Sequence, residues 1–350
     1  MIQTRTMTDL PILDNHNRPA RSLRISVTDR CNLRCGYCMP EEEYVWLPKE
    51  RLLRFEEITV LVEAFSRIGI DRVRLTGGEP LLRHGLPTLV AQLRQNTRVR
   101  EITLTTNGIR LAAQVEQLAK AGLDRVTLSL DTLSPERFRA LTRRDDHASA
   151  VAGLQSLRAA GMRGTKVNMV VQRGINDDEL CAMLAFSQEN EFELRFIEYM
   201  DVGGATKWSA DRVVSQASIL EHIQKDFGAV KVIEGRASAP AQRFELADGT
   251  RFGIIPSTTE PFCGACDRSR LTADGLWFLC LYARDGINLR DPLRAGANAD
   301  ELTELLTSVW SKRSDRGAVD RLQLERDRSV LAEKEELGEN PHLEMHTRGG

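Results

Sequence analysis

The sequence predicts an α/β protein: a partial (βα)6 TIM-like barrel followed by a smaller C-terminal α+β domain that carries a second group of cysteines. Between residues 23 and 198, six short β-branched segments alternate with helical segments, a pattern that indicates parallel βα units. Cysteines and unusual polar residues follow the carboxyl ends of these strands, where barrel enzymes place their sites. No G-x-G-x-x-G segment follows the first strand, which argues against a dinucleotide-binding sheet.

Side-chain periodicity predicts each element in turn. Alternating β-branched residues indicate strands, and apolar residues three or four positions apart indicate helices. The expected strands are 23–27, 73–76, 102–106, 125–130, 165–171 and 194–198. The expected helices are 55–68, 86–93, 111–121, one that begins at 134–135, 149–160, 177–189 and one near 211–227. Right-handed crossovers close such units into a barrel or a doubly wound sheet.

The character of the sequence changes near residue 230. Residues 230–255 alternate and carry glycine and proline, which predicts short strands, whereas residues 297–347 are charged and mostly helical. We therefore expect a loose N-terminal arm at 1–22 and the partial barrel at 23–230. The remaining 231–350 would form a smaller domain that carries the last three cysteines and ends in a diglycine tail.

Bulk composition excludes several classes of function. The chain has 350 residues and a net charge of −2, so we expect neither nucleic-acid binding nor attraction to a membrane surface. No apolar run approaches the length of a membrane span, and residues 1–20 lack the apolar core of a secretory signal. The expected location is cytoplasmic, where thiols stay reduced, so the seven cysteines indicate metal rather than disulfides.

Three of these cysteines form a C-x3-C-x2-C triplet directly after the first strand: Cys31, Cys35 and Cys38. Soft thiolates select zinc, Cu(I) or iron–sulfur clusters, and a closed cluster or structural zinc site takes four ligands. The next histidine is His84, so the triplet leaves one metal position open for chemistry. A zinc site with a distant fourth ligand is the alternative.

A second triplet lies in the C-terminal part: Cys263, Cys266 and Cys280. C-x2-C with a later cysteine also fits a zinc ribbon, which needs a fourth ligand. No histidine lies between His222 and His342. The residues alone leave both a cluster with one open iron and a zinc ion possible.

Basic residues gather in the same regions. Arg268 and Arg270 point to the same side if their segment is extended, and a pair of arginines suits phosphate oxygens. Others lie on the expected strands: Arg24, Arg72, Arg74, Lys166 and Arg195. Several like charges that face one lumen need an anion, and a triphosphate would satisfy them. The alternative is pairing with acidic residues or an outward orientation, which we expect for Arg72 in particular.

The cysteine octet resembles the signature of the radical S-adenosylmethionine (SAM) enzymes. Further segments follow in order: C-N-L-R-C-x-Y-C-M-P, L-T-G-G-E-P-L-L-R, T-T-N-G, S-L-D, R-F-I-E-Y-M-D and F-C-x-x-C-x-R-x-R-L-T-A-D-G. Together with a terminal Gly349-Gly350 they resemble the MoaA family, the GTP 3′,8-cyclases of molybdenum cofactor biosynthesis. The chain departs from the pattern at Asp267, where asparagine is common, and at Arg348, where an apolar residue is usual.

The resemblance implies two [4Fe-4S] clusters, SAM and a lyase reaction. An adenosyl radical would take the 3′ hydrogen of GTP, and C3′ would then attack C8 to give 3′,8-cyclo-7,8-dihydro-GTP. The implied SAM contacts are Tyr37, Gly77, Gly78, Glu79, Ser129 and Met200. The implied substrate contacts are Arg24, Arg74, Thr105, Lys166, Arg195, Arg268, Ser269 and Arg270. The second cluster would hold the guanine edge.

The implied partners are GTP, an external one-electron reductant such as a flavodoxin-like donor, and a downstream cyclic pyranopterin monophosphate synthase. A homodimer is compatible with the resemblance. We also expect Gly349 and Gly350 to reach the active site and position GTP, the alternative being a disordered terminus. Two other functions stay open: a radical SAM enzyme that modifies a peptide, which usually carries more C-terminal cysteines, and a zinc-stapled binding protein.

Overall fold

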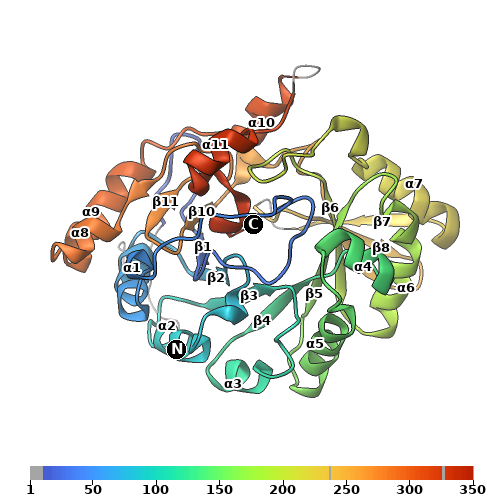
Figure 1. The fold of residues 1–350 in the computed structure, drawn as a ribbon, viewed down its shortest axis with the longest axis horizontal. Helices are drawn as coiled ribbons and strands as arrows, with labels where there is room; N and C mark the ends of the chain where they lie inside the picture. The colour runs from blue at the N-terminus through green and yellow to red at the C-terminus, as the bar shows by residue number, and fades with distance from the viewer. Residues whose placement is uncertain (1–10, 236–237, 325–327, 350) are drawn as a thin grey trace.

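The computed structural model describes residues 11–235, 238–324 and 328–349. Across these residues a single sheet curves into an open barrel, with most helices outside it (Figure 1). The strand order is β12-β11-β10-β1-β2-β3-β4-β5-β6-β9-β8-β7. The bounds are β1 (Ser22–Ser26), β2 (Arg72–Thr76), β3 (Glu101–Thr106), β4 (Arg125–Ser129), β5 (Lys166–Val171), β6 (Glu193–Glu198), β7 (Val230–Ile233), β8 (Gln242–Leu246), β9 (Arg251–Ile255), β10 (Arg268–Leu271), β11 (Leu276–Phe278) and β12 (Ile287–Asn288). The predicted partial barrel is confirmed.

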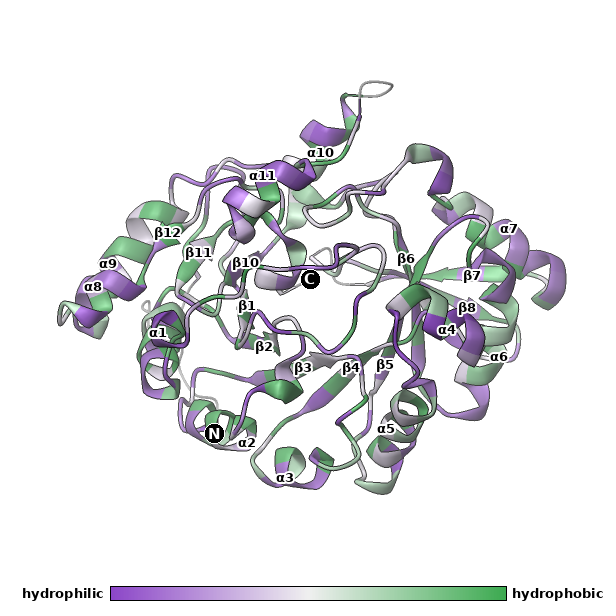
Figure 2. Ribbon diagram, viewed as in Figure 1, coloured by the Kyte–Doolittle hydropathy of each residue, from purple (hydrophilic) through white to green (hydrophobic). Residues whose placement is uncertain are grey.

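The helices follow the predicted alternation. They are α1 (Phe55–Arg67), α2 (Leu86–Arg94), α3 (Val115–Lys120), α4 (Pro135–Thr142), α5 (His147–Ala159), α6 (Leu180–Glu189), α7 (Gln216–Phe227), α8 (Arg290–Arg294), α9 (Ala299–Trp310), α10 (Gly317–Leu322) and α11 (Lys334–Glu339). The helix expected at 111–121 begins only at Val115, because residues 109–114 form turns. The outer helices carry both hydrophobic and hydrophilic residues (Figure 2), as expected where one face packs on a sheet.

The segments after residue 230 extend the same sheet at both edges. β9 pairs in parallel with β6, and β10 pairs in parallel with β1. The C-terminal cysteines therefore lie beside the first barrel strand, although more than 230 residues separate them in sequence. The domain boundary expected near residue 230 stays a prediction.

Side chains alternate between the two faces of the curved sheet. On β1, Leu23 and Ile25 are fully buried in the main core, whereas Arg24 lines the lumen. In register, Arg24 lies opposite Arg74 on β2 and Arg270 on β10. On this side of the barrel the apolar residues thus pack outward and leave the lumen to charged groups, whereas Val170, Ile197 and Ile255 line the lumen from β5, β6 and β9.

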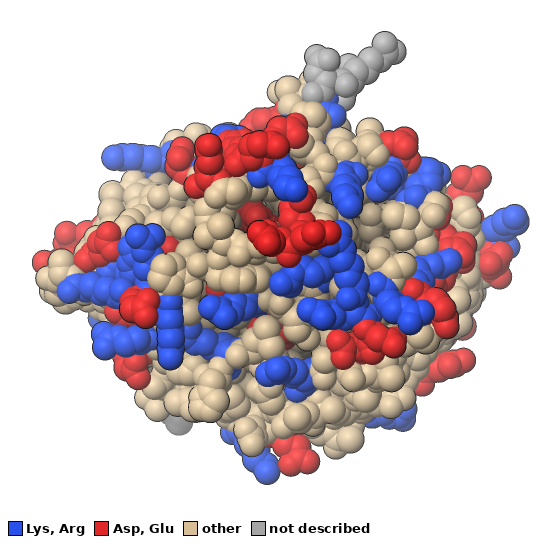
Figure 3. All heavy atoms as spheres, in the orientation of Figure 1, with Lys and Arg blue, Asp and Glu red and all other residues tan. Residues whose placement is uncertain are grey.

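The outside of the molecule offers no broad area of one charge on the face seen in Figure 3, where acidic and basic side chains lie close to one another. Within the described part of the chain, no helix is both long and apolar enough to cross a bilayer.

Candidate active site

The first cysteine triplet lines a cavity at the carboxyl ends of β1 to β4. This cavity, of about 130 Å³, has Cys31, Cys35 and Cys38 on its wall, together with Gly77–Glu79 and Ser129. The loop is folded on itself, because the amides of Cys38 and Met39 both donate to the carbonyl of Cys35. Three thiols from one tight loop therefore face a common space.

The paired glycines after β2 are required by the chain itself. A Cβ on Gly77 would overlap the carbonyl oxygen of Thr28, and one on Gly78 would overlap that of Arg30. The amide of Gly78 donates to Thr28 at 2.9 Å. Their absent side chains thus let the end of β2 pack against the segment that leads from β1 into the cysteine loop.

Glu79 holds this turn to the end of β3. Its carboxylate accepts hydrogen bonds from Thr106 Oγ1 at 2.7 Å and from the amides of Asn107 and Leu81 at 2.8 and 3.0 Å. Burial raises the pKa of Glu79 to about 6, against the effect of these bonds. Several lone pairs are already used, so Glu79 positions the loop as well as lining the cavity.

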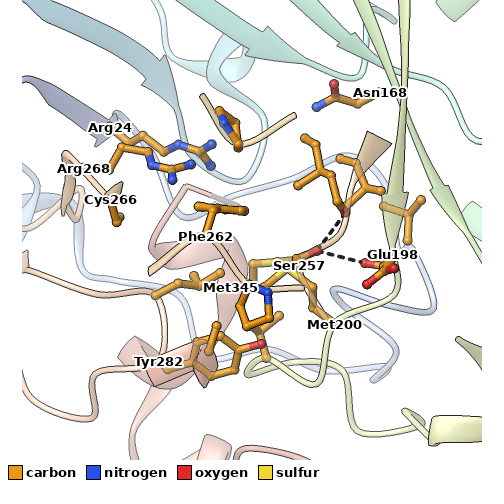
Figure 4. Close-up of a pocket in the computed structure, with 18 of the residues that line it drawn as sticks. Arg24, Asn168, Glu198, Met200, Ser257, Phe262, Cys266, Arg268, Tyr282 and Met345 are labelled. Carbon is orange, nitrogen blue, oxygen red and sulfur yellow. Dashed lines mark hydrogen bonds between the residues drawn. The ribbon is translucent and has the colours of Figure 1, made fainter. Parts of the chain in front are cut away.

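The second triplet lines a larger cavity of about 240 Å³ deeper in the barrel, where Cys263, Cys266 and Cys280 stand on one wall. Residues that line both cavities separate the two triplets: Tyr37, Thr105, Ser129, Asp131 and Met345. Tyr37 donates to Asp131 at 2.8 Å across this shared wall. Met200 lines the second cavity and not the first (Figure 4).

Arginines enter the second cavity beside Cys266. Figure 4 shows Arg24 and Arg268 pointing into the same space, across from Asn168. Arg268 stacks 4.4 Å from the centre of the Phe262 ring, and its Nε and Nη2 atoms are buried without a partner in the described chain. Burial and the charges of Arg270 and Arg268 lower the pKa of Arg24. Buried guanidinium donors that lack acceptors indicate a site for an anion.

The amino-terminal half of the lumen holds further cations. Arg74 donates to Thr105 and Thr127 at 3.0 and 3.1 Å. Glu193 pairs with Lys166 at 3.5 Å and with Arg195 at 2.8 Å. Burial, and then the charge of Arg195, lower the pKa of Lys166 to about 8. One carboxylate thus partly neutralises two of the predicted substrate contacts.

The geometry bears on two of these predictions. Ser269 lies beside Leu23 in register, so strand alternation turns its side chain away from the lumen that Arg268 and Arg270 face, and its contact with substrate stays a prediction. Arg72 forms the expected pair with an acidic residue, because its Nη2 donates to Asp267 at 2.6 Å. An aspartate at that position is therefore tolerated because it forms an ion pair.

The described end of the tail lies inside the barrel. The carbonyl of Gly349 accepts from Arg270 at 2.7 Å and from Arg24 at 3.4 Å. Gly349 has a φ of 66°, and a Cβ there would overlap Thr76 and stand 3.2 Å from Ser26 Oγ. Only glycine therefore fits this position. Gly350 lies outside the described residues.

Arg348 turns away from the lumen. Its side chain donates to the carbonyls of His342, Leu281 and Ala283, and its guanidinium stands 4.1 Å from the centre of the Phe278 ring. Carbonyl acceptors thus hold the guanidinium away from the lumen, although, after burial and the charge of Arg268, its charge also lowers the pKa of Arg270.

Comparison with known proteins places the chain in a family. A profile of the Radical SAM superfamily matches residues 25–187, and one described as Molybdenum Cofactor Synthesis C matches residues 192–319. The GTP 3′,8-cyclase 1 of Mycobacterium tuberculosis is 51% identical over 343 residues, covering 97% of this chain and 95% of that protein. The chain belongs to the GTP 3′,8-cyclase family. The GTP 3′,8-cyclase of Streptomyces coelicolor is 44% identical, covering 92% of this chain and 95% of its own length.

Among solved structures, this member of the cyclase family is similar to Streptococcus suis SuiB bound to S-adenosylmethionine. The TM-score is 0.58 at 17% identity, covering 88% of this chain and 69% of that one. At this identity the likeness shows the shared fold.

The cysteines of this cyclase-family chain are free thiols. All seven are in the described part of the chain and unpaired, yet among described residues no three His, Cys, Asp or Glu side chains converge on a single-ion site. Burial raises the pKa of Cys31 and of Cys280 to about 11. Thiols that are neutral at pH 7 become thiolates when a metal supplies positive charge.

Cys266 differs in its pKa from Cys31 and Cys280. Burial by itself raises its pKa, but the charges of Arg268 and Arg313, together with hydrogen bonds, lower it to about 7. Its thiolate is thus stabilised by the protein even before a metal binds.

The sequence reasoning missed a second glycine pair. A Cβ on Gly203 would overlap the carbonyl of Leu343, and one on Gly204 would overlap that of Cys38. The amide of Met345 also donates to Gly203 at 2.9 Å. The pair, which follows β6, thus lets the tail and the cysteine loop meet. A glycine pair after a strand was the available signal.

Proposed function

We propose that this chain is a GTP 3′,8-cyclase, which converts GTP to 3′,8-cyclo-7,8-dihydro-GTP in the first step of molybdenum cofactor biosynthesis. One observation carries the proposal. Two cysteine-lined cavities share a wall, and a cationic lumen that contains unpartnered guanidinium donors adjoins the second. A triphosphate fits this charge, and a nucleoside that is held between the triplets would lie within reach of both.

Cys31, Cys35 and Cys38 would hold a [4Fe-4S] cluster, and Gly77, Gly78, Ser129 and Met200 would contribute to the SAM site. When bound, this group supplies the electron for cleavage of SAM, which provides the adenosyl radical of a lyase reaction. Tyr37 would be held in place by Asp131. Cys263, Cys266 and Cys280 would hold a second [4Fe-4S] cluster, facing the guanine.

The side chains of the barrel would bind and orient GTP. Arg268 and Arg24 offer donors to the triphosphate beside Cys266, while Arg74, Lys166 and Arg195 extend the positive charge toward the amino-terminal end. Fixing both ends of the nucleotide holds C3′ and C8 close together, which supplies much of the rate enhancement. The tail closes the site and limits access of water to the radical.

The implied partners complete this proposal. The chain would take electrons from an external one-electron donor, for which a flavodoxin-like protein is our candidate. A cyclic pyranopterin monophosphate synthase would consume the product. A homodimer, a cytoplasmic location and the absence of nucleic-acid partners are part of the same proposal.

The proposal is tested by anaerobic reconstitution with iron and sulfide, followed by incubation with GTP, SAM and dithionite. Two [4Fe-4S] clusters require about eight irons per chain. We expect that iron content, 5′-deoxyadenosine and a cyclised guanine nucleotide. Zinc in place of iron, or SAM cleavage unaffected by GTP with no nucleotide product, would reject the function.

We expect Arg268 to form a hydrogen bond with the phosphates of GTP. Removing one charged hydrogen bond loses about 1.5–3 kcal/mol, so Arg268→Ala should weaken GTP binding roughly 10- to 150-fold. Guanosine affinity and iron content should change little, because guanosine has no phosphate. An equal loss of GTP and guanosine affinity, measured by calorimetry, would refute the phosphate assignment.

At alkaline pH, Lys166 should take up a proton when GTP binds. Its pKa is lowered to about 8, so above pH 8 the empty lumen holds mostly neutral lysine, which a triphosphate recharges. At pH 8.5 we expect uptake of about three quarters of a proton, measured as a dependence of binding enthalpy on buffer ionisation enthalpy. Lys166→Arg stays charged and should remove this dependence. A wild-type chain without buffer dependence would contradict the assignment.

A further inference from the structure

A buried arginine from the loop after α9 reaches the second cysteine triplet from outside the lumen. The side chain of Arg313 is only 1% exposed. Its Nη1 donates to the carbonyl of Cys266 at 3.1 Å, and its Nη2 lies 3.8 Å from Cys266 Sγ. Among the described residues, Arg313 is the only charged side chain with a hydrogen bond to a sulfur of either triplet.

Other groups fix the orientation of Arg313. Asp315 accepts from its Nε at 2.8 Å and from its Nη2 at 3.3 Å. The guanidinium stands 4.7 Å from the centre of the Trp310 ring, and Asp14 lies 3.9 Å from its Nε. A side chain held from three directions keeps its charge at one distance from the sulfur.

The N-terminal arm supports the same loop. Arg18, buried in an ion pair with Asp14 at 2.6 Å, donates to the carbonyl of Cys263 at 3.0 Å and to that of Asp315 at 2.8 Å. On the other side, a Cβ on Gly317 would meet Cys280 Sγ at 3.0 Å. The segment 313–317 therefore packs directly against the triplet, which brings one cation and one carboxylate to it.

We propose that Arg313, through its charge and its hydrogen bond to Cys266 Sγ, raises the reduction potential of the group held by Cys263, Cys266 and Cys280. The inference rests on the second cluster of the proposed function. A cluster gains negative charge when it is reduced, so a nearby cation and a hydrogen bond to its sulfur favour the reduced form. The carboxylate of Asp315 acts in the opposite direction through its own charge, while it holds Arg313 in place.

The test is a redox titration followed by electron paramagnetic resonance. The parent is the full chain with Cys31, Cys35 and Cys38 replaced by alanine, so that only the second triplet binds iron. In it, Arg313→Gln should shift the midpoint to more negative potential by at least tenfold in the one-electron equilibrium, which is about 59 mV. Arg313→Lys should keep most of the parent potential. Arg316→Gln, an equal charge change at an exposed arginine, is the matched control and should change it little.

Asp315→Asn supplies a change of opposite sign. Its side chain is 27% exposed, and losing its charge should move the midpoint to more positive potential. If Arg313 and Asp315 only stabilised the fold, their substitutions would not shift the midpoint potential in opposite directions. Equal potentials for Arg313→Gln and Arg316→Gln would overturn the proposal. If Arg313→Gln binds no iron, an unchanged or more negative potential for Asp315→Asn would overturn it. A parent that binds no iron would instead reject the second cluster itself, and this inference with it.

Discussion

Cys35→Ala is expected to abolish SAM cleavage, whereas Cys266→Ala is expected to retain SAM cleavage and to lose the cyclised product. The reason is the division of the two cavities: the first triplet lies with Gly77 and Gly78, and the second with Arg24 and Arg268. The measurement is the amount of 5′-deoxyadenosine and of cyclised nucleotide that each reconstituted variant forms. Where the cluster required for a product is missing, we expect the rate of forming that product to fall by more than about 1,000-fold.

Cys181→Ala is the matched control for this pair. Cys181 lies on α6 outside both triplets, with its sulfur 3.8 Å from the carbonyl of His222, so its loss should leave both products near the wild-type amounts. Normal cyclised product from Cys266→Ala would show that the second triplet is not part of the site.

Gly349→Ala is expected to retain iron content and SAM cleavage and to lower cyclised product by at least about 100-fold. Its Cβ would overlap Thr76, and the left-handed backbone at a φ of 66° disfavours alanine. The tail carbonyls would then lose their hydrogen bonds from Arg270, and the nucleotide would be exposed to water. A chain that lacks Gly349 and Gly350 should behave in the same way.

Gly338→Ala controls for the effect of an added methyl group near the C-terminus. Gly338 is on α11, and a Cβ there meets nothing within 4 Å, so this variant should be fully active. Cyclisation at the wild-type rate by Gly349→Ala would mean that the tail has no role in positioning GTP. Arg270→Ala should share the phenotype of the tail variants, because Arg270 donates to the carbonyls of Arg348 and Gly349.

Local patterns in the sequence predicted the barrel strands and the clustered cysteines, because strand periodicity and ligand spacing are short-range properties. The three cysteines of the first triplet lie within eight residues, so any fold of that loop brings them close together. The alternation that places Arg24 in the lumen and Leu23 in the core is equally local.

Contacts between distant segments could not be predicted in this way. β10 joins the sheet beside β1, which alone decides that Ser269 faces Leu23 and that Arg72 meets Asp267. The contact of Arg313 with Cys266 depends on how α9 and its following loop pack against the second triplet, which no local pattern indicates. The outward turn of Arg348 likewise depends on carbonyls from residues 281–283.

A radical formed at the first triplet should take hydrogen from C3′ of GTP that is held beside the second triplet. GTP that carries deuterium at C3′ tests it directly, by mass spectrometry of the 5′-deoxyadenosine formed in a single turnover. We expect 5′-deoxyadenosine that is one mass unit heavier, together with cyclised product that has lost the label. Unlabelled 5′-deoxyadenosine alongside GTP that keeps its deuterium would contradict it.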